Sequence, residues 1–326
     1  MGKQEQQAIK HQTIYQYVFT VFTPTYNRAY ILHRVYESLK AQTYRDFEWL
    51  IVDDGSTDNT WELVKQWQKE ADYPIRYLYQ ENNGKYIAWN HGVREAKGEL
   101  FLCFDSDDAC VPEALERFKY HWDSIAENKK EDFSSVVCLC KSRKGELIGS
   151  KFPQEITDSD YLEIQYKFKV KGDKWGFDKT EVLKRFPFPV IESETLIGEG
   201  VVWNALARNK FKTRFVNETL LFKQYLPDGL SIMANAAPSK NALGTALLHK
   251  SILNKDIGWF WYAPLSFVRS AIHYSRFSFH IGNSISKQLK PIESKIGTIL
   301  WLIALPLGYL VYIKDRLFKK SNENNF

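Results

Sequence analysis

Apolar runs alternate with helically spaced apolar residues over the first third of the chain. The runs that predict strands cover residues 18–22, 47–52, 75–79 and 100–104. The helically spaced segments between them cover residues 30–42, 58–70 and 85–96. The run at 100–104 has no polar alternation, which is typical of a strand buried on both faces. The whole pattern predicts an α/β fold, a mostly parallel sheet flanked by helices with right-handed crossovers.

The pattern becomes less regular after residue 112. It predicts further helices over 112–128 and 199–210 and further strands over 135–140 and 215–225. Residues 172–176 contain two glycines and predict a loop. From these changes we expect three parts, which are a polar segment over 1–16, an α/β domain over 17–235 with halves 17–112 and 113–235, and a helical region over 236–326.

Residues 296–313 are almost wholly apolar and about long enough to cross a bilayer. Basic residues flank this stretch on both sides, at Lys287, Lys290, Lys295, Lys314, Arg316, Lys319 and Lys320. Pro306 and Gly308 interrupt its middle, which predicts a hairpin or a helix lying in the membrane interface rather than a simple span. The alternative is a C-terminal helix buried against the α/β domain.

Polar side chains follow the predicted parallel strands, at the edge where open α/β sheets bind ligands. Three carboxylates, those of Asp105, Asp107 and Asp108, come directly after the run at 100–104. Carboxylates this close repel one another unless a cation lies among them. Oxygen ligands indicate a hard ion, Mg²⁺ or Mn²⁺, shared with phosphates. The alternative is a solvated acidic turn that caps the next helix.

The other polar groups at this edge suit a nucleotide diphosphate. The carboxylate of Asp53 or Asp54 can accept an N–H of a nucleobase, because a carboxylate is an acceptor only. Thr25 can line the base and the ribose, and Lys85 and Arg28 are cations suited to a diphosphate. Taken singly, each of these residues also has a structural explanation, as a turn, a helix cap or a surface ion pair.

Composition narrows the classes of partner. The net charge of +5 is too small to indicate nucleic acid. The four cysteines form no Cys-x-x-Cys pair, which favours reduced thiols in a cytosolic domain. The first sixteen residues have no apolar core, so we expect no signal peptide. The first strand is not followed by Gly-x-Gly-x-x-Gly, which argues against a dehydrogenase.

Four motifs occur in order: Thr23-Pro24-Thr25-Tyr26-Asn27-Arg28, Val52-Asp53-Asp54-Gly55-Ser56-Thr57-Asp58, Asn83-Gly84-Lys85 with Ala88 and Asn90, and Asp105-Ser106-Asp107-Asp108. As a set, over residues 17 to about 232, they resemble the family 2 glycosyltransferases. The resemblance implies a Rossmann-like GT-A fold, a donor half over 17–112 and an acceptor half over 113–235. It also implies an enzyme that inverts the anomeric centre of a nucleotide sugar.

The resemblance implies roles for particular residues. The donor, usually a UDP-sugar, would contact Pro24, Thr25, Tyr26, Arg28, Asp53, Asp54, Asn83, Lys85, Asp105 and Ser106. The metal, Mn²⁺ or Mg²⁺, would be held by Asp107 with Asp105. The general base would be Glu199, with Glu194 and Glu192 as alternatives. Trp175 and Trp203 could stack on the acceptor sugar, although packing in the core is an equally good explanation for each.

The chain has no Gln-x-x-Arg-Trp motif of the processive members. Residues 224–231 resemble instead the bacterial transferases that build capsule or lipopolysaccharide repeats, which add one sugar. With the apolar C-terminal stretch, this suggests a lipid-linked saccharide acceptor at the cytoplasmic face of the cell membrane. Two alternatives from other classes are a sugar-phosphate nucleotidyltransferase, which usually carries a Gly-rich phosphate loop, and a non-catalytic membrane scaffold.

Overall fold

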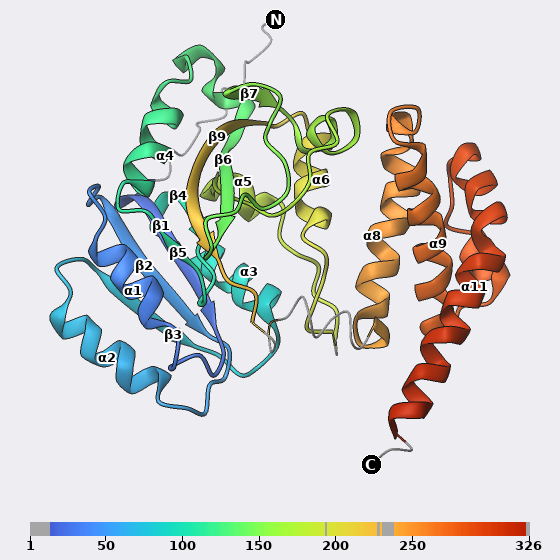
Figure 1. Cartoon of the computed structure of the whole chain (residues 1–326), viewed down its shortest axis with the longest axis horizontal. Coiled ribbons are helices and arrows are strands. Elements are labelled where there is room, and N and C mark those ends of the chain that lie inside the picture. Colours follow the sequence, from blue (N-terminus) through green and yellow to red (C-terminus); the bar gives the residue numbers. More distant parts are fainter. Residues whose placement is uncertain (1–13, 193, 227–228, 230–237, 324–326) are drawn as a thin grey trace, which may run out of the picture.

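The computed structural model describes residues 14–192, 194–226, 229 and 238–323, with side chains up to Leu317. A nine-stranded sheet flanked by helices forms the larger part, and a group of helices from the C-terminal part stands beside it (Figure 1). The expected polar segment 1–16 lies mostly outside the described residues, as do the expected boundary at 235 and half of the 224–231 motif.

The N-terminal half has the predicted parallel βα arrangement. Its strands are β1 (Tyr17–Thr25), β2 (Phe47–Asp53), β3 (Ile75–Tyr79) and β4 (Gly98–Cys103), and they pair in parallel in the order β3-β2-β1-β4. Its helices are α1 (His33–Lys40), α2 (Thr60–Glu70) and α3 (Lys85–Glu95). Every residue of β2 is buried, as expected for a strand covered by helices on both faces.

The second half makes the sheet mixed rather than mostly parallel. The strands are β5 (Ala109–Cys110), β6 (Phe133–Ser142), β7 (Ile156–Ser159), β8 (Lys174–Lys179) and β9 (Lys212–Lys223). The helices are α4 (Ala114–Asp123), α5 (Thr180–Arg185) and α6 (Gly200–Arg208). Strand β8 lies between β4 and β6 and is antiparallel to both, while β6 and β9 are parallel.

The expected loop at 172–176 is wrong, because most of it belongs to β8. Its sequence, Lys-Trp-Gly-Phe-Asp-Lys, is short and carries a glycine, so it does not read as a strand. The glycine is there because the chains approach closely, since a Cβ on Gly176 would lie 2.2 Å from the carbonyl oxygen of Val136 on β6.

Two aromatic-rich cores hold the sheet between its helices. On one face, Trp49 packs with Tyr36 and Trp67, whose rings stack at 4.6 Å. On the other face, Phe22 of β1 stacks on Phe101 of β4 at 5.0 Å. These packed layers leave the carboxyl ends of β1, β2 and β4 in fixed positions, so side chains that follow them are held at one edge.

The C-terminal part consists of α8 (Ala242–Lys255), α9 (Pro264–His280), α10 (Ile285–Leu289) and α11 (Lys295–Glu323). It is joined to the α/β domain through α6. Arg208 Nε and Nη2 donate to the two carboxylate oxygens of Asp256 at 2.6 and 2.7 Å, and Asn204 Nδ2 donates to the same group at 3.1 Å. Asp256 is 1% exposed, so the Arg208–Asp256 ion pair connects the two parts in the interior of the protein.

The apolar C-terminal stretch forms one helix, so the expected hairpin is wrong. Pro306 lies inside α11 without ending it. The helix packs along α9, and a Cβ on Gly308 would lie 2.6 Å from Ser275 Cβ and 2.9 Å from the carbonyl oxygen of Ile272. Gly308 therefore allows two helices to approach closely, and the packing holds α11 together despite the hydrogen bond that Pro306 cannot make.

Candidate active site

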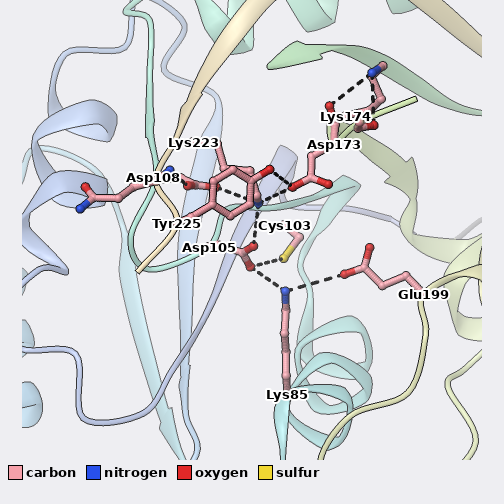
Figure 2. Close-up of polar contacts among 11 residues, drawn as sticks. Lys85, Cys103, Asp105, Asp108, Asp173, Lys174, Glu199, Lys223 and Tyr225 are labelled. Atoms are coloured by element: carbon pink, nitrogen blue, oxygen red, sulfur yellow. Dashed lines mark hydrogen bonds and ion pairs between the residues drawn. The ribbon is translucent and has the colours of Figure 1, made fainter. Parts of the chain in front are cut away.

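A network of carboxylates and lysines lies where β4 ends (Figure 2). Lys85 Nζ, from the first residue of α3, is 2.8 Å from Asp105 Oδ1 and 3.8 Å from Glu199 Oε1. Lys223 Nζ, from the last residue of β9, is 3.5 Å from Asp105 Oδ2 and 3.4 Å from Asp108 Oδ2. Two lysines that are far apart in the sequence thus both contact the Asp105 carboxylate.

The charges in this network stabilise one another. Burial raises the pKa of the Asp105 carboxyl, but the cations of Lys85 and Lys223 more than offset this, so its pKa lies below its ordinary value. Burial alone would lower the pKa of Lys85, but Asp105 and Glu199 raise it well above its ordinary value. Asp105 is therefore ionised and both lysines are charged at neutral pH.

Asp108 and Asp173 extend the network toward β9. The backbone N–H of Gln224 donates to Asp108 Oδ1 at 3.0 Å, and burial raises the pKa of Asp108 to about 7. Lys223 Nζ is also 3.8 Å from Asp173 Oδ2, to which Tyr225 Oη donates at 2.8 Å. Asp108 and Asp173 thus fix Lys223 and the chain that follows it.

Asp53 and Asp54, the expected contacts of the base, hold the strand ends together. Asp53 accepts hydrogen bonds from the Ser56 N–H at 2.7 Å and from the Tyr77 hydroxyl. Asp54 accepts from Gln80 Nε2 and from the N–H groups of Asn83 and Gly84, at 2.8, 3.0 and 2.8 Å. Both are buried, so any contact with a base is made by carboxylates that already organise the loops around them.

The turn at Gly84 connects this edge to the segment before Glu199. Gly84 has φ of +93°, and a Cβ there would lie 2.8 Å from Thr195 Cα and 2.9 Å from its carbonyl oxygen. Only glycine fits this position. Asp54 therefore fixes this turn by accepting the Gly84 N–H. The turn places Lys85 in the network, and it also packs against Thr195.

The remaining expected donor residues lie at the end of β1, in the loops that follow β1 and β4, and in the turn before α3. Tyr26 is exposed, Arg28 and Pro24 are half-buried, and Ser106 is buried. Thr25 is buried, and its hydroxyl has no hydrogen-bond partner within the described part of the chain. Asn83 is an exposed residue whose side chain donates to the Glu81 carbonyl at 2.9 Å.

The partly buried, negatively charged surroundings of Asp107 suit a metal ligand. Burial and the neighbouring charge of Asp105 raise the pKa of the Asp107 carboxyl, while Lys223 and Arg28 act in the opposite direction. Two crowded carboxylates whose repulsion a cation would relieve are a suitable donor set for a hard ion that also binds phosphates. Within the described residues no group of three or more His, Cys, Asp or Glu side chains could hold a metal, so any ion here needs other ligands.

Of the three expected candidates for the general base, Glu199 lies at the network. It precedes α6, and its side chain is 55% exposed and faces Lys85. The Glu194 carboxylate instead accepts the N–H groups of Leu243 and Gly244 at 2.5 and 2.7 Å, at the start of α8. Glu192 is exposed and is not among the residues that line the cavity described next.

A cavity of about 810 Å³ opens beside the network. Lys85, Asp105, Glu199 and Lys223 contribute to its wall, with both expected acceptor tryptophans. Trp175 is only 7% exposed, and its Nε1 donates to the Cys103 carbonyl at 2.6 Å, so it is mainly a core residue.

Trp203 is half-buried, and its ring stacks on that of Tyr161 at 5.8 Å with 17° between the planes. It lies four residues after Glu199, which brings both side chains to the same face of the helix start.

Sequence reasoning missed many residues of this cavity, among them Lys223, Asp173, Tyr161 and Asp178. Lys223 lies near the end of the strand predicted over 215–225, so the sequence did indicate that it lies at the sheet edge. The other three lie in or beside the irregular segment after residue 141, where no periodicity indicates which side chains face inward.

The fold has known counterparts. Staphylococcus aureus TarS 1–349 in complex with UDP-GlcNAc aligns with 89% of this chain and 80% of its own, with a TM-score of 0.52 at 20% identity. The mannosyltransferase PcManGT from Pyrobaculum calidifontis, in complex with GDP-Man and Mn²⁺, aligns with 94% of this chain and 84% of its own, with a TM-score of 0.53 at 18% identity. Fold and topology thus define a GT-A α/β protein.

Sequence comparison finds a related family. Residues 20–156 match the model of glycosyl transferase family 2. An uncharacterized glycosyltransferase of Nostoc sp. is 41% identical over 98 residues, which are 30% of each chain. An uncharacterized glycosyltransferase of Rickettsia felis is 37% identical over 32% of this chain and 17% of its own. The matches therefore span less than a third of these two relatives.

A longer match is the GalNAc(5)-diNAcBac-PP-undecaprenol beta-1,3-glucosyltransferase of Campylobacter jejuni. It is 24% identical over 246 residues, which are 72% of this chain and 74% of that protein.

Proposed function

We propose that this protein transfers one sugar from a nucleotide-diphosphate sugar to a saccharide acceptor, with inversion at the anomeric carbon. The observation that carries the proposal is the meeting of Lys85, Asp105, Glu199 and Lys223 at one cavity beside the carboxyl end of β4. Cations for a diphosphate and a carboxylate for an incoming hydroxyl are the two groups that such a transfer requires.

The donor would lie across the ends of β1, β2 and β4. The base would lie near Asp53 and Asp54, and the diphosphate near Lys85 and Lys223. A UDP-sugar is the proposed donor, by analogy with the UDP-GlcNAc complex of the structural neighbour. The two lysines are charged at neutral pH, and their charges would stabilise the negative charge that develops on the departing diphosphate.

Asp107, with Asp105, would hold a divalent ion, Mn²⁺ or Mg²⁺, together with the donor phosphates. When bound, that ion would supply a further positive charge to the diphosphate. Asp105 is already paired with two lysines, which makes Asp107 the more available oxygen ligand.

Glu199 would act as the general base. Its carboxylate would take the proton of an acceptor hydroxyl while that oxygen bonds to the anomeric carbon, and the bond from this carbon to the diphosphate oxygen would break with its electron pair. A single displacement of this kind inverts the anomeric centre. Lys85 Nζ lies 3.8 Å from the Glu199 carboxylate and would hold it beside the diphosphate.

A lipid-linked saccharide is the proposed acceptor, and α11 the proposed contact with the membrane. The Campylobacter relative is named for an undecaprenol-linked substrate. Of the helices in the described part of the chain, α11 is the one long and apolar enough to cross a membrane. Its outer face is apolar and exposed, at Ile299, Leu302, Ile303, Leu307 and Leu310.

The other face of α11 is joined to the protein. Trp301 and Ala304 are buried, and Arg276 Nε donates to Asp315 at 2.6 Å. A helix with one buried and one apolar exposed face suits a position in the plane of the interface. The lysines at its ends would meet anionic headgroups at the cytoplasmic face.

The test is a thermal-shift panel of UDP-, GDP- and dTDP-sugars with and without Mn²⁺, followed by product analysis. A ligand that binds only the folded state raises the melting temperature, so we expect a shift with one nucleotide class that grows with Mn²⁺. Turnover should release the nucleoside diphosphate. Release of pyrophosphate would contradict the proposal and indicate a nucleotidyltransferase, and no shift with any donor would refute donor binding.

A further inference from the structure

The C-terminal helices supply part of the wall of the active-site cavity. Helix α8 contributes Thr245, Leu248 and His249, and α9 contributes His273, Arg276 and Phe277. The same cavity is lined by Glu199 and Trp203 of the α/β domain. A molecule that reaches Glu199 within this cavity is therefore enclosed partly by the helical region.

Several polar atoms of this wall have no hydrogen-bond partner in the described part of the chain. They are His249 Nδ1, His273 Nδ1 and Asp178 Oδ1, and all three are buried. The two imidazoles stack at 5.0 Å with 23° between their planes. An unsatisfied buried polar atom is costly and rare in folded proteins, and three of the eight such atoms in the described part of the chain belong to residues that line this cavity. A ligand that supplies polar groups would satisfy them.

This part of the wall carries little charge. Burial, with the neighbouring His273, lowers the pKa of His249 to about 3, so its imidazole is neutral. Burial raises the pKa of Asp178 to about 8, so its carboxyl is protonated at neutral pH. The charge of Arg276 is balanced by Asp315, whose two oxygens accept from it at 2.6 and 2.8 Å. Neutral donors and acceptors suit an uncharged, hydroxyl-rich ligand.

An aromatic surface completes the arrangement. Tyr161 and Trp203 stack in parallel and both line the cavity. Aromatic faces pack against the apolar faces of sugar rings, while hydroxyl groups at the ring edge bond to polar side chains. The stack adjoins Glu199, because Trp203 is four residues further along the same helix start.

We infer that the terminal sugar of the acceptor, an uncharged hexose or N-acetylhexosamine, binds between the Tyr161–Trp203 stack and the His249–His273 pair. The helical region is then part of acceptor recognition and not only a membrane support. This inference rests on the proposed function and adds the chemical class of the acceptor's terminal sugar and the residues that select it.

The test uses the full-length chain and saturation-transfer NMR with methyl β-glycosides of glucose, galactose, N-acetylglucosamine and N-acetylgalactosamine. Methyl β-glucuronide serves as a charged comparator. We expect at least one of the four neutral glycosides to bind the wild-type chain and the glucuronide to bind much more weakly. The inference is overturned if none of the four binds, or if the glucuronide binds equally well.

Variants then locate the binding. His249→Leu and His273→Leu remove the polar atoms and keep the volume, and should each weaken glycoside binding about tenfold, the loss expected for one or two hydrogen bonds. His33→Leu, at an exposed position on α1, is the matched control and should change nothing. Tyr161→Leu, on a different segment, tests the stack and decides the question if a histidine variant does not fold.

Calorimetric titration with UDP separates this inference from the proposed function. The variants should bind UDP as the wild type does. Unchanged glycoside binding in the histidine variants and in Tyr161→Leu, with UDP binding intact, would overturn the acceptor site alone. A wild-type chain that binds a glycoside but no nucleotide would overturn the proposed function instead.

Discussion

Asp178 allows one prediction to be worked out in free energy. It lies on β8, is 5% exposed, and burial raises its pKa from 3.8 to about 8. The folded chain therefore keeps this proton up to about pH 8, whereas the unfolded chain loses it near pH 4. Between these values the unfolded state is favoured increasingly as the pH rises. We expect Asp178→Asn, which has the same shape and no titratable group, to remove this pH dependence.

The magnitude follows from the linkage relation. One proton bound by the folded state alone is equivalent to about 1.4 kcal/mol per pH unit. Between pH 5 and pH 7 the variant should therefore gain about 2 to 3 kcal/mol in free energy of unfolding relative to the wild type. For a chain of this size that is a shift of several degrees in melting temperature.

The assay is scanning fluorimetry of both proteins at pH 5, 6, 7 and 8 and at one heating rate. Asp132→Asn is the control, because Asp132 is exposed. The gap in melting temperature between Asp178→Asn and wild type should widen up to pH 8, while the control gap stays constant. A gap that is constant or narrows over this range would refute the assignment of a buried, protonated carboxyl.

Three further predictions concern the proposed activity. Glu199→Gln should bind the donor normally and lose transfer by about 100-fold or more, since the base is removed; an unchanged rate of nucleoside diphosphate release would exclude Glu199 as the base. Asp107→Asn should abolish stimulation by Mn²⁺, and chelation with EDTA should then lower wild-type turnover but leave the variant unaffected; equal stimulation in both would contradict the metal role. Ile303→Asp with Leu310→Asp should reduce flotation with anionic liposomes and leave donor binding intact, whereas unchanged flotation would argue against membrane contact through α11.

The N-terminal half could be predicted because its central strands are covered on both faces. Such strands appear in sequence as continuous apolar runs, as at Leu100 to Phe104, and the polar residues after them necessarily share an edge. Strand β8 could not be predicted in this way. Its apolar positions are few, and its Gly176 marks a close approach that becomes apparent only beside β6.

The candidate site was predictable only in part, for a related reason. Lys85 and Asp105 follow parallel strands in order, so their meeting follows from the fold. Lys223 reaches Asp105 because β9 returns to the sheet from more than a hundred residues away, and nothing local encodes that pairing. Of the two forms expected around Pro306, a hairpin or an interfacial helix, the hairpin is wrong because packing along α9 outweighs the local effect of proline.

The close approach at Gly84 links the proposed donor site to the position of Glu199. The Asp54 carboxylate holds the Gly84 turn, and the same turn supports Thr195, four residues before Glu199. A nucleobase that drew Asp54 away from the Gly84 N–H would loosen this support, and the carboxylate that awaits the acceptor would shift with it. With the roles proposed for Asp54 and Glu199, donor binding and the position of the general base would be coupled through a single glycine, and a bulkier residue there would disturb both together.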